Sequence, residues 1–157
     1  MINIVKSCPL FQELYHDELE DILQECVVVH FEPGANIIKE GEEGKDFFVV
    51  LSGRATVSKN IKGREVKIAT LTKGDVFGER VILNDNIRAT TISAMTGCDF
   101  LVVDHETILN LYQKNPKTFS ILVMNMVRLL DKRLSHSKAA LRAIHERLNR
   151  TNWLKVS

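Results

Sequence analysis

Residues 74–91 read GDVFGERVILNDNIRATT, which places a glycine, a carboxylate and an arginine, Gly78, Glu79 and Arg88, on one short segment. Gly78 lets the backbone approach a ligand closely, and the apolar residues after it can start one helical turn whose free N–H groups point at an anion. Glu79 can accept a hydrogen bond from a sugar hydroxyl, while the guanidinium of Arg88 offers a fixed fork of donors to phosphate oxygens. These residue types at this spacing suit a ribose joined to a cyclic phosphate.

The same segment resembles the phosphate-binding cassette of the cyclic nucleotide-binding domain family, which is found in catabolite activator proteins and in kinase regulatory subunits. In that cassette Phe-Gly-Glu, here residues 77–79, is followed nine residues later by Arg-Ala-Thr, here residues 88–90. The similarity runs from about residue 7 to about residue 135. It implies that the ligand is bound by Phe77, Gly78, Glu79, Arg80, Val81, Ile82, Arg88, Ala89 and Thr90.

The resemblance also implies a role for each group. Glu79 would hold the ribose 2′-hydroxyl, Arg88 would pair with the phosphate, and backbone amides near Val81 and Ile82 would complete the cradle. Ala89 resembles cAMP-type sites, whereas cGMP-type sites often have a threonine there that bonds the guanine amino group. The resemblance therefore favours cAMP as the ligand and leaves cGMP open.

Two neighbouring residues depart from the family pattern. Arg80 and Val81 stand where the family usually has Leu or Ile followed by a small residue. Arg80 either adds a second phosphate contact or points to water, as long cationic side chains usually do. The bulk of Val81 is expected to crowd the ligand, and it supports the alternative of a degenerate domain that keeps the fold and dimerises without binding nucleotide.

The chain before residue 105 is predicted to be mainly β-structure with flanking helices. Asp17 is expected to cap a first helix. Strand-length runs rich in β-branched and aromatic residues follow, separated by glycine and proline turns. These runs lie at residues 27–31, 47–51, 55–59, 65–71, 89–94 and 98–104. The pattern predicts an antiparallel jelly-roll β-barrel, the cyclic nucleotide-binding fold, in a domain of residues 1–116.

A long helix is predicted over residues 117–149, which contain no glycine or proline, and a tail over residues 150–157. Apolar positions recur along this helix at spacings of three and four, the pattern of a coiled coil. The expected dimer seam consists of Val127, Leu130, Leu134, Leu141, Ile144 and Leu148, with Ser137 at one position. The stripe either packs on the barrel or pairs with a second copy, and a barrel cannot cover about 50 Å of helix. We expect a parallel homodimer.

The same helix is expected to close over the nucleotide base, as the resemblance implies. Arg133 and His136 lie at about the height where that contact would occur. Residues 128–157 also carry eight Lys or Arg against two acidic residues, so the end of the chain is basic. That charge indicates either a solvated flank of the seam or contact with an acidic partner or nucleic acid.

Composition and motifs limit the remaining classes. The 157 residues, 45% of them hydrophobic, fit one globular domain, and no segment approaches the roughly 20 apolar residues of a membrane helix. The three cysteines are odd in number and far apart, which favours reduced thiols and a cytoplasmic protein. No metal-ligand spacing or catalytic motif is present, so we expect no enzyme, no metal and no cofactor.

The sequence therefore predicts a stand-alone cyclic nucleotide sensor, with cAMP as the expected ligand, in which binding repositions a C-terminal dimerisation helix. Residues 150–157 are too few for a helix-turn-helix, so we expect no DNA-binding domain and a downstream protein partner of unknown kind. The degenerate dimerisation module remains the alternative.

Overall fold

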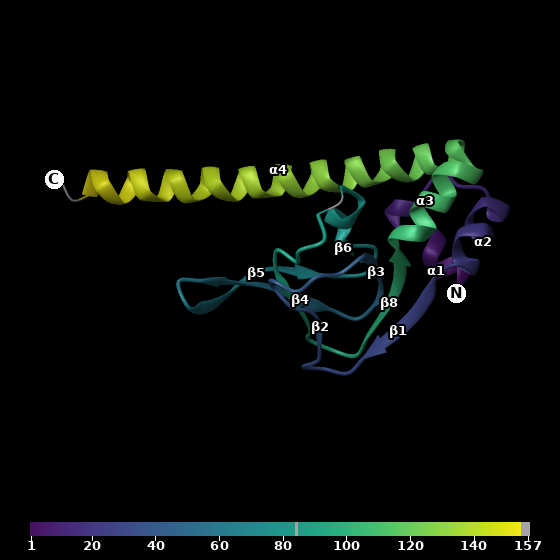
Figure 1. Ribbon diagram of the computed structural model, residues 1–157. Helices are drawn as coiled ribbons and strands as arrows, with labels where there is room; N and C mark the ends of the chain where they lie inside the picture. The colour runs from purple at the N-terminus through teal and green to yellow at the C-terminus, as the bar shows by residue number, and fades with distance from the viewer. Residues whose placement is uncertain (84, 155–157) are drawn as a thin grey trace.

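The computed structural model describes residues 1–83 and 85–154, and it shows a β-roll crossed by one long helix (Figure 1). Its strands are β1 (Val27–Phe31), β2 (Asn36–Ile38), β3 (Asp46–Ser52), β4 (Ala55–Ile61), β5 (Arg64–Leu71), β6 (Val76–Phe77), β7 (Thr91–Ala94) and β8 (Cys98–Asp104). They pair antiparallel in two four-stranded sheets, ordered β1-β8-β3-β6 and β2-β7-β4-β5. The predicted mainly β fold class is confirmed.

The short α-helices lie at one end of the roll, beside the N-terminus, and the long C-terminal helix begins there and runs past the roll (Figure 1). They are α1 (Ile2–Lys6), the 3₁₀ helix η1 (Pro9–Phe11), α2 (His16–Gln24), α3 (His105–Lys114) and α4 (Pro116–Leu154), while the 3₁₀ helix η2 (Glu79–Leu83) lies in the cassette. Pro116 opens α4, where its missing N–H removes no helical hydrogen bond. Within the described residues every helix is too short or too polar to cross a lipid bilayer.

The central strand β3 is buried on both faces and thereby joins two cores. Phe47, Val49 and Leu51 pack with residues of the helices, whereas Phe48 and Val50 pack between the two sheets. Successive side chains of a strand point to opposite faces, which explains this alternation. One strand consequently holds the helical layer on the outside of the same sheet that lines the interior.

A buried asparagine fastens α4 to the N-terminal segment. The side-chain amide of Asn125 donates to the carbonyl oxygens of Leu10, at 3.0 Å, and Gln12, at 2.7 Å. Beyond this point α4 runs past the roll and projects from it (Figure 1). Leu141, Ile144 and Leu148 are 66%, 55% and 59% exposed, so the distal half of the predicted seam is uncovered in the single chain.

Several boundaries differ from the sequence expectation. Asp17 does not cap α2 but lies in its first turn; Tyr15 precedes the helix, and its N–H donates to Oε2 of Glu18 at 2.9 Å. Helix α4 continues to Leu154, so the expected tail from residue 150 is helical as far as that residue, and residues 155–157 lie outside the described part. Strands β2 and β6 were not predicted because three and two residues are too few for a period-two pattern.

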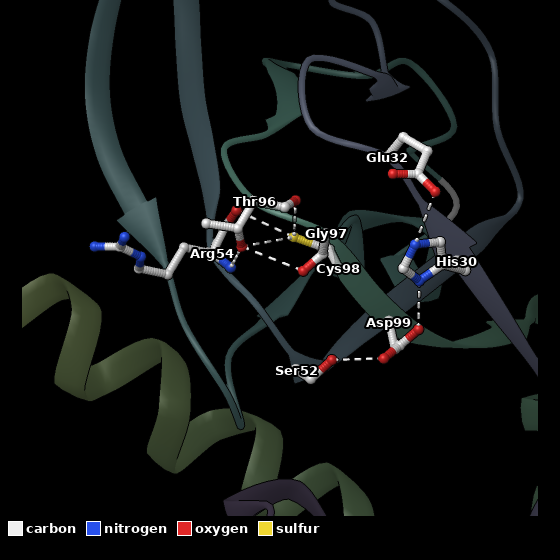
Figure 2. A network of polar contacts seen from close by, with 8 residues as sticks. All are labelled: His30, Glu32, Ser52, Arg54, Thr96, Gly97, Cys98 and Asp99. Carbon is white, nitrogen blue, oxygen red and sulfur yellow. Dashed lines mark hydrogen bonds and ion pairs between the residues drawn. The ribbon is translucent and has the colours of Figure 1, made fainter.

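A polar network ties the three adjacent strands β1, β8 and β3 (Figure 2). Nδ1 of His30 on β1 lies 2.7 Å from Oδ1 of Asp99 on β8, and Oγ of Ser52 on β3 donates to Oδ2 of Asp99 at 2.6 Å. The hydrogen bond to Asp99 raises the pKa of His30, and the bonds from Ser52 and His30 lower the pKa of Asp99.

This network should make stability depend on pH. The raised pKa of His30 means that its contribution is fully present below its unfolded pKa of about 6.5 and is lost as pH rises through the folded value. The lowered pKa of Asp99 means that its contribution is present above about pH 3.9 and is lost as pH falls through the folded value. His30→Ala should therefore lower the melting temperature more at about pH 5.5 than at about pH 8.5.

Thermal melts of the wild type and His30→Ala at both pH values test this expectation. His136→Ala, which removes an exposed histidine from α4, is the control. An equal penalty for His30→Ala at the two pH values would contradict it.

Candidate functional site

A cavity of about 290 Å³ lies between the interior strands, the cassette and α4. This volume is close to the lower end of the ~300–1,000 Å³ typical of small-molecule pockets. The cavity is lined by most of the residues that the sequence assigned to the site, namely Phe77, Gly78, Glu79, Arg80, Arg88, Ala89, Thr90 and Arg133. Its other walls come from Ile38, Val57, Ala69, Leu71, Asp85, Ile87 and Ile92.

Arg88 is the buried cation of this cavity, with 7% of its surface exposed. Its Nη1 donates to the carbonyl oxygen of Asp46 at 2.8 Å, and its guanidinium lies 5.9 Å from the ring centre of Phe48. Burial lowers the pKa of Arg88, but an arginine remains charged at neutral pH. Within the described residues no carboxylate forms a salt bridge with it, so its positive charge is available to an anionic ligand.

Two glycines make room for this guanidinium. A Cβ added at Gly44 would lie 2.2 Å from Nη2 of Arg88, and one at Gly78 would lie 2.7 Å from Nη1. Gly78 also has a φ of 77°, which side chains rarely adopt. Sequence reasoning identified Gly78 but missed Gly44, Asp46 and Phe48, because these contacts join segments about forty residues apart and leave no local pattern.

The predicted helical turn after Gly78 is present as η2, and its apolar side chains point away from the cavity. Val81 is fully buried in the core beneath the helices, so the expectation that its bulk crowds the ligand is wrong. Ile82 packs against the same core and does not line the cavity. The N–H of Val81 lies 3.3 Å from the carbonyl oxygen of Gly78. The family's small residue is replaced here without obstructing the pocket.

Glu79 connects the cavity to the long helix. Its Oε1 lies 3.2 Å from Nη1 of Arg133 on α4, and Arg133 also donates to the carbonyl oxygen of Val76. The predicted approach of α4 to the site is thus found at Arg133. His136 does not line the cavity and is exposed; it lies about 4.5 Å further along α4 than Arg133.

Arg80 forms an ion pair with Asp85 across the cassette, and about half of its side chain is exposed. The two residues are five apart in the sequence, which is not a spacing that predicts a side-chain pair, so the sequence did not reveal it. Arg80 thus lies at the edge of the cavity with its charge partly compensated, whereas Arg88 lies inside and, among the described residues, forms no salt bridge, although the Asp46 carboxylate attracts it. Within that part of the chain no cluster of His, Cys, Asp or Glu suits a metal ion.

Comparison with known proteins identifies relatives of this chain. The family described as cyclic nucleotide-binding domain matches residues 28–115. The chain is 32% identical over 147 residues to cGMP-dependent protein kinase 2 of Homo sapiens, a match that covers 88% of the chain and 19% of the kinase. It therefore spans only a small part of that relative.

Two solved structures agree with the fold. A cyclic nucleotide-binding domain from Methylobacillus flagellatus has a TM-score of 0.80 at 21% identity, covering 88% of this chain and 79% of that one, and this likeness shows the fold alone. The regulatory domain of Toxoplasma gondii PKA, crystallised with cAMP, has a TM-score of 0.62 at 28% identity and covers 69% of this chain and 41% of that one.

Proposed function

Because the chain belongs to the family of cyclic nucleotide-binding domains, we propose that it is a regulatory sensor that binds a cyclic nucleotide, with cAMP preferred over cGMP. Ligand binding changes the position of α4, and α4 pairs with that of a second copy. The observation that carries the proposal is Arg88, a buried guanidinium that faces the cavity and has no carboxylate partner among the described residues.

The phosphate of the ligand supplies the charge that Arg88 lacks. A buried cation is costly unless an opposite charge with good hydrogen-bond geometry accompanies it. One of its N–H donors is used by the carbonyl of Asp46, which fixes the orientation of the guanidinium. The remaining donors form the planar fork that matches phosphate oxygens. Glycine at positions 44 and 78 leaves this fork free of Cβ atoms.

The ribose lies against Glu79. Oε1 of this carboxylate is taken by Arg133, which leaves Oε2 to accept a hydrogen bond from the 2′-hydroxyl. A carboxylate held by a neighbouring arginine is already oriented before the ligand arrives, so less side-chain freedom is lost on binding. Glu79 therefore connects the sugar to α4.

The preference for cAMP follows from the walls around the base. Ile38, Val57, Leu71 and Ile92 present apolar surface to the cavity, and Ala89 contributes no hydroxyl. Guanine has a carbonyl and an amino group that lose hydrogen bonds to water when they are buried against such walls. The cAMP bound to the Toxoplasma domain supports the choice. The human relative is named a cGMP-dependent kinase, so cGMP is the competing ligand to test.

Calorimetric titration of the purified chain with cAMP and cGMP tests the ligand and the role of Arg88. We expect micromolar or tighter binding of cAMP, weaker binding of cGMP, and a loss of about 100-fold or more in Arg88→Ala, because the phosphate then has no buried counter-charge. Arg64→Ala, which removes an exposed arginine of β5, is the matched control. If neither nucleotide produced heat or a shift in melting temperature, the assignment would be wrong, and the chain would be a degenerate domain that dimerises without binding nucleotide.

Coupling to α4 rests on the shared carboxylate. Arg133 contacts both Glu79 and the carbonyl of Val76, so the helix is fastened to the two ends of the turn that holds the ligand. A ligand shifts the helix only if it binds one helix arrangement better than the other, and such coupling free energies are typically about 1–3 kcal/mol.

Arg133→Ala should uncouple the helix from the site. Loss of the oriented carboxylate should weaken cAMP binding about 5- to 10-fold, and the change in hydrogen exchange of α4 on adding saturating cAMP should disappear. Lys132→Ala, one position earlier and exposed, should retain both. The same cAMP-dependent exchange difference in Arg133→Ala as in the wild type would refute the coupling.

The second copy pairs along the exposed distal half of α4. Leu134, Leu141, Ile144 and Leu148 alternate at heptad spacing and have no cover in the single chain. In a parallel coiled coil, a residue at heptad position g of one helix approaches the residue five positions later, at position e, of the other helix. With Leu134 at position a, Arg133 occupies position g and lies near Lys138 of the partner subunit. Because Arg133 is already paired with Glu79 of its own chain, this contact adds little repulsion, and the dimer rests on the apolar seam.

Sedimentation at several salt concentrations tests the pairing. The wild type should be dimeric, and the double substitution Leu141→Asp with Ile144→Asp should make it monomeric by burying two charges in the seam. Ala139→Asp with Ala143→Asp adds the same charge on other faces of the helix and should leave the dimer intact. A wild type that sediments as a monomer at high protein concentration would rule the homodimer out.

The remaining parts of the proposal concern the chain's role in a cell. We propose binding without catalysis, and a downstream protein that senses the position of α4. The three cysteines are unpaired, which favours a cytoplasmic location.

A further inference from the structure

A second cavity, of about 260 Å³, lies on the other side of η2 from the nucleotide pocket. Its walls come from η1, α2, β3, β8, α3 and η2, and the first half of α4 forms its roof. Phe47, Val103, Ile108 and Leu122 are buried in its walls, whereas Leu83 at its mouth is 81% exposed. The cavity is thus enclosed by apolar side chains and open at one side.

The lining of this cavity repels water and polar ligands. Apart from Glu79 and Arg80 at the rim, every lining residue is apolar, and those two are already engaged with Arg133 and Asp85. A buried water needs two to four polar partners, and the apolar inner walls of this cavity supply none. An engineered cavity of about 150 Å³ admits benzene. The present one has room for a larger hydrocarbon.

The roof of the cavity is held open at both ends. Asn125 fastens α4 to the carbonyls of Leu10 and Gln12, and Arg128 is 3.0 Å from Glu13. Further along the helix, Arg133 is bound to Glu79 and to the carbonyl of Val76. A cavity closes only as far as its surroundings can relax, and these polar anchors limit the approach of α4 to the sheet.

We propose that this cavity is a binding site for an uncharged, apolar small molecule of about two fused rings or an equivalent hydrocarbon chain. Such a ligand gains the dispersion contacts that the void lacks and removes its own apolar surface from water. An anionic ligand is disfavoured, because the one cation of the lining, Arg80, is already paired with Asp85 and the other lining residues, Glu79 apart, are apolar.

Occupancy of this site changes the affinity of the nucleotide pocket, a consequence that rests on the proposed function. Glu79 and Arg80 border both cavities, and η2 forms the wall between them. An apolar ligand contacts Ile82 and Leu83 on η2 and Val127 and Leu130 on α4, the two elements that meet at the nucleotide. Linkage requires that each ligand change the other's affinity by the same factor.

Fluorescence titration of the full chain with N-phenyl-1-naphthylamine tests the site. We expect one probe per chain. Val123→Phe should fill the cavity and weaken probe binding at least about tenfold, whereas Met124→Phe, an exposed neighbour that does not line the cavity, should stay within about twofold. Thermal melts establish that both variants are folded. A crystal soaked with 1-bromonaphthalene should show bromine density in this cavity, which tests the site without any substitution.

The outcomes separate this site from the nucleotide pocket and from the seam. Arg88→Ala should leave probe binding unchanged, so the site stands even if the chain binds no nucleotide. Probe and cAMP should alter each other's dissociation constant by an equal factor of about three or more, and no such shift would overturn the linkage alone. Three outcomes would overturn the site. Val123→Phe could bind the probe as tightly as the wild type, or several probes could bind per chain. Binding could also be lost in the Leu141→Asp, Ile144→Asp variant.

Discussion

The buried guanidinium of Arg88 is the constraint on which the site depends. It is held by a carbonyl of β3 and lies over Phe48 of the same strand, so the loop that carries it is fastened to the centre of the roll. Gly44 and Gly78 are needed at their positions because any side chain there would displace it. A buried cation is stabilised by an anion, and we propose that the anion binds in the cavity in front of it.

Helix α4 connects the cavity to the rest of the molecule through the contact between Arg133 and Glu79. Its first half is anchored by Asn125, its middle by Arg133, and its distal half carries an exposed apolar stripe. The short helix η2 lies beneath the middle of α4 and separates the cavity that contains Arg88 from the second, apolar cavity. Glu79 and Arg80 of η2 line both cavities, so η2 is the wall that the two share.

The β-roll could be read from the sequence almost strand by strand, because β-branched runs between glycine turns leave a local pattern. Strand β1 has the predicted bounds, and β4, β5 and β8 begin within one residue of them. Strand β7 begins later than predicted, at Thr91, since Ala89 and Thr90 line the pocket instead. The two shortest strands, β2 and β6, had no pattern long enough to detect.

The cassette residues that contact a ligand lie close together in the chain, so sequence alone determined the identity of Glu79 and Arg88, the apolar turn after Gly78 and the long final helix. Only the tertiary structure decided where Val81 points, which residues surround Arg88, and that Arg133 rather than His136 meets the site. These depend on how the helix and the sheet lie against each other. That register is set by contacts between distant segments, and a linear sequence carries no local signal for them.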